Sequence, residues 1–189
     1  MKRRGNVIRF RSQVVVIFAV VAGGSLLVAT GQGAAATAEA TVNSISAAGI
    51  GARVGTVTFT DTAGGLLITP KLLGLPPGQH GFHIHEKGNC GDGVNQGKPA
   101  AGFAAGGHYD PAHTKKHLGP FSTAGHRGDL PVLVVDTRGD ATQPVTAPHL
   151  AVAEIRGHSV MIHAGGDNYS DTPLPLGGGG GRIGCGVIR

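Results

Sequence analysis

The sequence predicts an all-β fold, an antiparallel sandwich or barrel, as the single domain of a chain of 189 residues. Short segments of alternating apolar and polar residues recur along the chain, and glycine or proline turns separate them. Glycine is abundant at 34 residues, whereas aromatic residues make up 4% of the chain and charged residues 14%. This composition favours turns and short strands over long helices. No segment has a convincing helical period, and no internal repeat is evident.

The beginning of the chain has the pattern of an export signal. Basic residues up to Arg11 precede an apolar stretch from 14 to 29, and Ala36-Thr37-Ala38 then matches a cleavage site. We therefore expect residues 1–38 to be a signal peptide and residues 39–189 to form an exported domain, periplasmic, extracellular or in the cell envelope. An uncleaved anchor is the alternative. The apolar stretch is short for a span of ~20 residues, so no stable membrane insertion is expected after cleavage.

The net charge of +5 belongs to this leader. Five of the 16 basic residues lie in the first eleven positions, and no acidic residue precedes Glu39. Because eleven basic and eleven acidic residues remain, the rest of the chain is neutral. A nucleic-acid partner is therefore not expected.

Four strands are expected in the first half of the domain, over residues 39–49, 54–60, 66–72 and 79–85. The second alternates most clearly, with Val57 and Phe59 on one face and threonines on the other. A turn at Asp61–Gly65 and a corner at Pro76–Gly78 separate the later strands.

The alternation stops after Glu86, and no sustained period follows from 88 to 129. A segment of this length inside a compact domain is usually functional or disordered. Its composition favours function, because it contains several potential metal ligands: Cys90, His108, His113, His117, His126 and Asp129. A bound metal can order a segment that has no core of its own.

Strands are expected again over residues 130–135, 144–152, 160–163 and 182–188. A second irregular stretch runs from 164 to 181 and ends in five consecutive glycines. The pattern throughout is that of short strands joined by turns and two long loops.

A histidine pair lies on the strand expected over 79–85. Side chains two residues apart on a strand share a face, so His83 and His85 point the same way while Ile84 faces the core. Two neighbouring imidazoles form half of a site for copper or zinc. Alone, such a pair is more often an ordinary surface feature. The further histidines of the long loop favour the metal-site interpretation.

Seven motifs, in this order and spacing, resemble the copper–zinc superoxide dismutases, specifically their exported bacterial branch. They are Gly81-Phe82-His83-Ile84-His85-Glu86, Gly107-His108-Tyr109-Asp110-Pro111, His117-Leu118-Gly119-Pro120, Gly125-His126-Arg127-Gly128-Asp129-Leu130, Met161-Ile162-His163, Gly165-Gly166-Asp167-Asn168 and Arg182-Ile183-Gly184-Cys185-Gly186-Val187. The resemblance covers the chain from about Thr41 onward. It implies a Greek-key β-sandwich or flattened barrel with long metal-binding loops.

The resemblance also implies a function, the conversion of superoxide anion to dioxygen and hydrogen peroxide at a copper bridged to zinc, and a possible homodimer. A non-catalytic copper-binding or carrier module on the same fold is the alternative, because a fold alone does not determine function. Such a module would be expected to lack part of the copper set or Arg182, whereas this chain has all of them.

The ligand sets follow from the same resemblance. It assigns copper to His83, His85, His108 and His163. It assigns zinc to His108, His117, His126 and Asp129, with His108 shared as a bridging imidazolate. Asp167 would accept N–H bonds from His83 and His117 and so orient both rings.

The remaining expectations concern the cysteines, Arg182, a proton-transfer role for His108 and the histidines outside the ligand sets. Cys90 and Cys185, the only cysteines, are expected to form a disulfide, with two free thiols as the alternative. Arg182 occupies the family's anion-guiding position, and His108 is expected to take and return a proton. The histidines outside the ligand positions are expected at the surface or in loops: His80, His113, His149 and His158.

Overall fold

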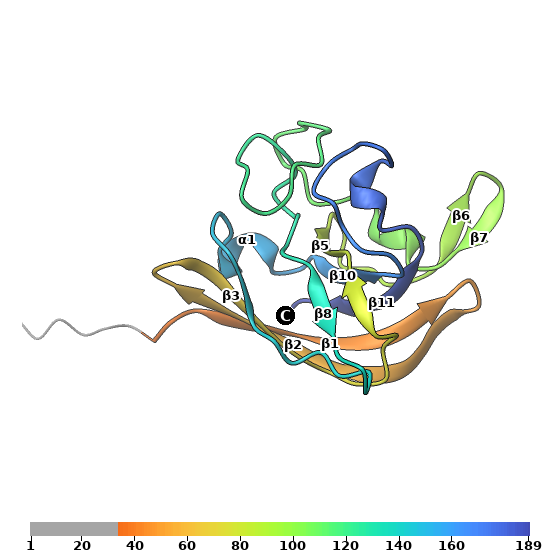
Figure 1. The fold of residues 1–189 in the computed structure, drawn as a ribbon, viewed down its shortest axis with the longest axis horizontal. Helices are drawn as coiled ribbons and strands as arrows, with labels where there is room; N and C mark the ends of the chain where they lie inside the picture. Colours follow the sequence, from red (N-terminus) through yellow and green to blue (C-terminus); the bar gives the residue numbers. More distant parts are fainter. Residues whose placement is uncertain (1–33) are drawn as a thin grey trace, which may run out of the picture. The chain divides into compact units, whose positions relative to one another are not determined.

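The computed structural model describes residues 34–189, and its main element is a seven-stranded antiparallel sheet (Figure 1). The strands lie in the order β5-β10-β11-β1-β2-β3-β9. Their bounds are β1 Thr37–Ser46, β2 Gly49–Thr62, β3 Gly65–Leu72, β5 Phe82–His85, β9 Val145–Ala147, β10 Ser159–His163 and β11 Arg182–Val187. Two further strand pairs are β4 Gly78–His80 with β8 Leu133–Val135, and β6 Gly93–Asn95 with β7 Lys98–Ala100. Three one-turn helices complete the structure: η1 Phe103–Ala105, α1 Val152–Ile155 and η2 Leu176–Gly178.

The strand order is that of a Greek key. β1, β2 and β3 are consecutive neighbours, but β11, the last strand, returns to lie beside β1. Leu133 and Val135 of β8 are buried in the same core as Val57 and Phe59 of β2, so that the β4–β8 pair and the large sheet cover one core. The predicted all-β Greek-key sandwich is therefore confirmed.

Period-two alternation explains why the long strands form. In β2, Val57 and Phe59 are fully buried, whereas the threonines between and beside them are only partly buried. β3 repeats the pattern with Leu66, Ile68 and Leu72 inside the core. Each strand thus places one apolar face inward, as the sequence predicts.

The expected strand over 79–85 is in fact two strands that pair with different partners. β4 pairs with β8, β5 pairs with β10, and Gly81 separates them. The Gly81 amide donates to the carbonyl oxygen of Gly165 at 2.7 Å, and its own carbonyl accepts from the His163 amide at 2.9 Å. The chain therefore changes partner at this glycine, which joins the metal-binding strand to the second loop.

The surface or loop prediction for His80 is wrong. This side chain is 2% exposed, and its two ring nitrogens lie 2.7 Å from the carbonyl oxygen of His163 and 2.8 Å from that of Pro76. The break at Gly81 turns His80 inward, toward the start of the second loop. The other three histidines of that group lie in turns and loops between the strands.

Two further segments differ from expectation. The segment expected as a strand over 144–152 contains only the short β9 and then turns into α1. The α1 start is held by a bond from the Val152 amide to Asp61 Oδ1 at 2.7 Å. The long segment over 88–129 is mostly irregular, as predicted, but contains the β6–β7 hairpin and η1.

Most of the predicted leader, residues 1–33, lies outside the described residues. Thr37 and Ala38, which the predicted boundary assigns to the leader, pair in β1 with Thr60 and Phe59, and Ala38 is buried. Within residues 34–189, no helix has the length and apolar character needed to cross a membrane.

Candidate metal centre

The part of the chain that the structure describes contains two groups of potential metal ligands whose ligand atoms all lie within 4.8 Å of one another. The four-histidine cluster consists of His83, His85, His108 and His163. The histidine–aspartate cluster consists of His83, His108, His117 and Asp129. All of these side chains are buried, so both clusters are inside the protein rather than on its surface.

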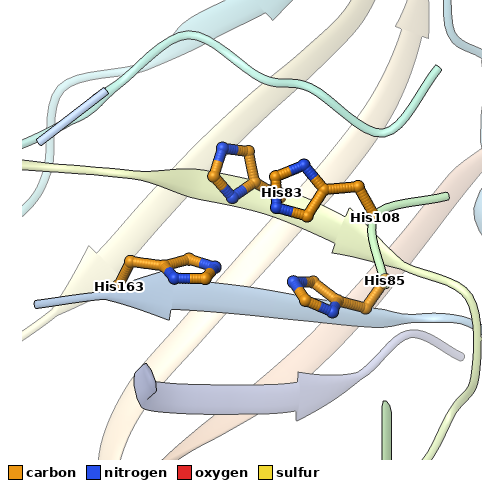
Figure 2. A group of neighbouring side chains, drawn as sticks. All are labelled: His83, His85, His108 and His163. Atoms are coloured by element: carbon orange, nitrogen blue, oxygen red, sulfur yellow. The ribbon is translucent and has the colours of Figure 1, made fainter. Parts of the chain in front are cut away.

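Strand pairing assembles most of the four-histidine cluster. His83 and His85 share one side of β5, while Ile84 between them is buried in the main core. β10 pairs alongside β5 and ends at His163, and His108 enters from the long loop through an isolated bridge to His85. Figure 2 shows the four rings gathered together, with those of His85 and His163 pointing toward one another.

In each ring of this cluster, one nitrogen is hydrogen-bonded to a carbonyl or carboxylate oxygen and the other has no hydrogen-bond partner. Nδ1 of His85 donates to the Gly106 carbonyl oxygen at 3.0 Å, and Nδ1 of His163 donates to that of Gly180 at 3.2 Å. The unpaired buried atoms are His83 Nδ1, His85 Nε2, His108 Nε2 and His163 Nε2. Leaving buried polar atoms unpaired is costly, so four together indicate a missing common partner.

The second cluster is built around the carboxylate of Asp129. Oδ1 of Asp129 lies 3.0 Å from His108 Nδ1 and 3.4 Å from His126 Nδ1, and its Oδ2 lies 3.1 Å from His117 Nδ1. The Nδ1 atoms of His117 and His126 are also buried without a hydrogen-bond partner. Three imidazole nitrogens therefore converge on one buried carboxylate.

His83 and His126 differ in whether a ring nitrogen is free to bind a metal in this second cluster. His83 has Nδ1 in the four-histidine cluster, and its Nε2 is bonded to Asp167 at 2.7 Å. His126 has a free buried Nδ1 next to Asp129. His126 is thus the better donor for a metal at Asp129, although its ligand atom lies outside the 4.8 Å group.

Asp167 connects the two clusters from the second loop. Its Oδ2 accepts from His83 Nε2 at 2.7 Å, and its Oδ1 accepts from His117 Nε2 at 2.8 Å. The Tyr169 amide also donates to Oδ1, at 2.7 Å. Gly177 passes over this contact with φ +72°, where any Cβ would collide with the Asp167 carboxylate. One carboxylate therefore orients a ring in each cluster.

Burial and charge set the ionisation of these groups. Burial lowers the pKa of each imidazole in the four-histidine cluster, to about 4 for His163, so these rings are neutral and able to bind metal. Burial also acts to lower the pKa of His117, but the two neighbouring carboxylates, Asp129 and Asp167, outweigh this and raise the pKa to about 9. Burial acts to raise the pKa of both carboxyls, yet hydrogen bonds from the imidazoles hold both well below the usual range.

The donor chemistry fits two different metals. Four imidazole nitrogens suit copper, for which imidazole is a favoured ligand. Three imidazoles with one carboxylate suit tetrahedral zinc. His108 has one nitrogen for each set, since Nε2 belongs to the four-histidine cluster and Nδ1 faces Asp129.

Comparison with known proteins agrees with this donor chemistry. The family model described as copper/zinc superoxide dismutase matches residues 53–188. The chain belongs to the copper/zinc superoxide dismutase family. Superoxide dismutase [Cu-Zn] 2 of Salmonella typhimurium is 53% identical over 156 residues, which cover 82% of this chain and 90% of that relative.

Solved structures of the family share the fold. The Brucella abortus Cu/Zn superoxide dismutase is 47% identical with a TM-score of 0.79, and the match covers 82% of this chain and all (100%) of that one. The copper, zinc superoxide dismutase of Salmonella enterica, described as monomeric, is 53% identical with a TM-score of 0.73 and the same coverage. As a family member, this chain uses copper and zinc.

The predicted disulfide of this dismutase is confirmed. Cys90 and Cys185 are bonded, with the sulfur atoms 2.02 Å apart and 95 residues of separation in sequence. In the chain-entropy model, closing a loop of this length stabilises the native state by roughly 4–5 kcal/mol. The bond attaches the long loop to β11, where both cysteines are buried with Met161 in a second, smaller core.

Arg182 lies beside the four-histidine cluster. It stands opposite His163 in the pairing of β10 with β11. Its Nη1 donates to the Gly102 carbonyl oxygen at 2.6 Å, and its Nη2 donates to that of Gly106 at 2.7 Å. Together with His108 and His163 it lines a cavity of about 470 Å³. A fixed positive charge therefore lies at an opening onto two of the cluster histidines.

Several groups that shape the site could not be identified from sequence. The Gly106 and Gly180 carbonyls orient ligand rings, but backbone acceptors leave no residue-type signal. Asp171 accepts from the His117 amide at 2.9 Å, and its only sequence signal is that it lies four residues beyond Asp167. Phe103, which lines the cavity, lies in a segment without periodicity.

The pKa shifts predict how the stability of the metal-free protein depends on pH. The lowered pKa values of the four-histidine cluster mean that its stabilising contribution is complete above pH ~6.5 and lost as pH falls toward the native pKa values. Asp129 and Asp167 act in the same direction at still lower pH. His117 alone acts oppositely, since its raised pKa implies loss of stability as pH rises from ~6.5 to about 9.

We therefore expect the free energy of unfolding of the metal-free protein to be highest near neutral pH, to fall steeply on the acid side and to fall gently on the basic side. Urea titrations between pH 4 and 9 after chelation measure this directly. Stability that stays level from pH 7 down to pH 4.5 would contradict the neutral, buried state of the four imidazoles.

Proposed function

We propose that this protein is a superoxide dismutase in which His83, His85, His108 and His163 hold copper, and His108, His117, His126 and Asp129 hold zinc. The observation that carries the proposal is the position of His108. Its Nε2 is an unpaired atom of the four-histidine cluster, while its Nδ1 lies 3.0 Å from Asp129 Oδ1. One imidazole thus belongs to both donor sets, so His108 would be a ligand of both metals.

When bound, copper supplies the one-electron chemistry in which one superoxide is oxidised to dioxygen and another, with two protons, is reduced to hydrogen peroxide. The chain's own residues orient the ligand rings and take part in proton transfer. Asp167 holds the rings of His83 and His117 in their tautomers and orientations. His108 lines the cavity, and its Nε2 would pass a proton to the reduced product when that nitrogen is not bound to copper.

Arg182 is proposed to attract and orient the anion. The chain beyond the leader is formally neutral, so net charge does not draw superoxide to the site. A guanidinium fixed by two carbonyl oxygens at a cavity next to His163 provides a local field instead. Steering of this kind, for which superoxide dismutases are a standard case, raises on-rates by ~10–10³-fold and weakens with salt.

Two replacements of Arg182 should separate the effect of its positive charge from that of its fixed guanidinium geometry. Arg182→Ile should lower the second-order rate by about ten-fold or more and flatten its salt dependence, because the local field is lost. Arg182→Lys should retain most of the salt dependence but less of the rate, since lysine cannot bind both carbonyls as a fork. Pulse radiolysis at several ionic strengths measures both quantities. A wild-type rate and salt slope in Arg182→Ile would show that the arginine is only structural.

The non-catalytic carrier is the less supported alternative. A carrier needs metal ligands but not a fixed cation at the cavity that His108 and His163 line. The decisive experiment is to reconstitute the metal-free protein with copper, zinc or both, and to measure metal content and superoxide disproportionation together. We expect one copper and one zinc per chain, and activity only where copper is present. Stoichiometric loading without activity would identify a carrier instead.

We further propose that the protein is exported and acts in the periplasm, the cell envelope or outside the cell, after cleavage near residue 38. Support comes from the basic, then apolar leader and from the Cys90–Cys185 bond, because disulfides persist in oxidising compartments. A homodimer stays a prediction, and the S. enterica relative is described as monomeric. Mass spectrometry of the protein recovered from a cell envelope fraction tests the boundary.

A further inference from the structure

The aromatic ring of Phe103 lies against the guanidinium of Arg182. The Arg182 Cζ is 5.6 Å from the centre of the ring, within the range of a cation–π contact. Both side chains line the cavity of about 470 Å³ that reaches His108 and His163. Phe103 is 38% exposed, so it forms part of the cavity mouth rather than of a core.

The backbone around Phe103 holds this ring in place. Gly102 precedes it and Gly106 ends η1, and the carbonyls of these two glycines are the acceptors for Arg182 Nη1 and Nη2. Gly93 of β6 also packs against this side chain, since an added Cβ there would lie 3.0 Å from the Phe103 Cβ and 3.3 Å from its Cδ1. The ring therefore belongs to the same short segment whose carbonyl oxygens bind the guanidinium.

This arrangement limits how the guanidinium can act. A guanidinium has five N–H donors in one plane. Two carbonyl oxygens accept from Nη1 and Nη2, and the guanidinium carbon lies over the Phe103 ring. The N–H donors that these carbonyls leave unused are available to an anion in the cavity, and the Phe103 ring occupies part of the wall of that cavity. A small anion can reach them more easily than a bulky one.

We infer that Phe103 is a positioning and size-selecting residue for the anion site, one that fixes the Arg182 guanidinium and favours small monoanions over tetrahedral oxyanions. The inference rests on the proposed function, because it assumes that an anion approaches through this cavity. The contribution of Phe103 is distinct from that of the Arg182 charge. Replacing Phe103 is therefore expected to change anion selectivity and not metal binding.

Three variants of Phe103 separate the effect of the aromatic face on Arg182 from the effect of side-chain bulk on anion size. Phe103→Ala removes both the ring face and the bulk, Phe103→Leu keeps most of the bulk without the ring face, and Phe103→Tyr keeps both. Phe121→Ala is the matched control, because Phe121 is 69% exposed and lies outside the cavity lining.

The first measurement is the rate at which phenylglyoxal modifies Arg182, followed by mass spectrometry in the metal-free and metal-loaded proteins. The second compares the dissociation constants of azide and phosphate for the metal-loaded protein, from titrations of its visible absorption.

We expect Phe103→Ala to speed modification of Arg182 by about two- to five-fold, the scale of losing one partly exposed cation–π contact. Phosphate should bind tighter by about the same factor in this variant, whereas azide binding should change less than about two-fold. Phe103→Leu should speed modification but still exclude phosphate, and Phe103→Tyr should match the wild type in both measurements.

Wild-type modification rates and an unchanged azide-to-phosphate ratio in Phe103→Ala would overturn the inference, as would a Phe103→Tyr variant that behaves like Phe103→Ala. Failure of the proposed function gives a different result, namely a wild-type protein that binds both metals without disproportionating superoxide. The modification rate in the metal-free protein reports on Phe103 independently of that activity.

Discussion

Replacing His163 with alanine should reduce superoxide disproportionation by more than the ~100-fold that is typical for losing a residue outside the direct ligands. His163 ends β10, is 6% exposed, and belongs to the four-histidine cluster alone. Its Nδ1 is held by the Gly180 carbonyl, so that Nε2 is aimed at the cluster without a partner. Removing it leaves three imidazoles and opens a cavity at the reaction centre.

The measurement pairs activity with copper content, with His149→Ala as the control for loss of an imidazole. His149 lies outside both clusters and makes only a long, 3.4 Å contact to the Phe121 carbonyl oxygen. The control should retain wild-type copper and activity. A His163→Ala protein that binds copper stoichiometrically and keeps near-normal activity would refute the proposed copper set.

Replacing Asp129 with asparagine should have the largest effect on stability. The carboxylate is 2% exposed, faces three imidazoles, and accepts from the Gly119 amide at 3.2 Å. Asparagine keeps the shape but removes the charge that would bind zinc. A ~100-fold weaker zinc affinity corresponds to about 2.7 kcal/mol of lost stabilisation when zinc is in excess. For a chain of this size, that lowers the melting temperature by about 5–10 °C.

The effect of Asp129→Asn should exceed that of His163→Ala in metal-saturated buffer, because the zinc set orders the longer loop. Calorimetry with saturating and with chelated metal separates the metal contribution from the fold itself. Asp92→Asn, a change at an exposed carboxylate, serves as the control and should leave the melting temperature unchanged. Equal melting temperatures for Asp129→Asn and His163→Ala in saturating metal would count against the zinc role.

Local patterns in the sequence were sufficient for much of the fold. The period of two predicts that Val57 and Phe59 share one face of their strand and that His83 and His85 share a side of theirs, and the structure has both features, with Val57 and Phe59 in the core. These predictions succeed because side-chain direction along a strand depends on backbone geometry and not on distant residues. The order of motifs also identified the family, which the comparisons show.

Tertiary structure alone decided how these residues become a site. Gly81 ends one strand pairing and begins another because its backbone bonds to Gly165 and His163, far away in sequence, and this same break buries His80. The contact of Phe103 with Arg182 joins a loop to the last strand. Such contacts are absent from local patterns, since they exist only once the Greek key has brought the loops together over β5 and β10. The sequence thus determined the ligand types and the strand faces, whereas the fold decided which nitrogen of each ring is held and which is free to bind a metal.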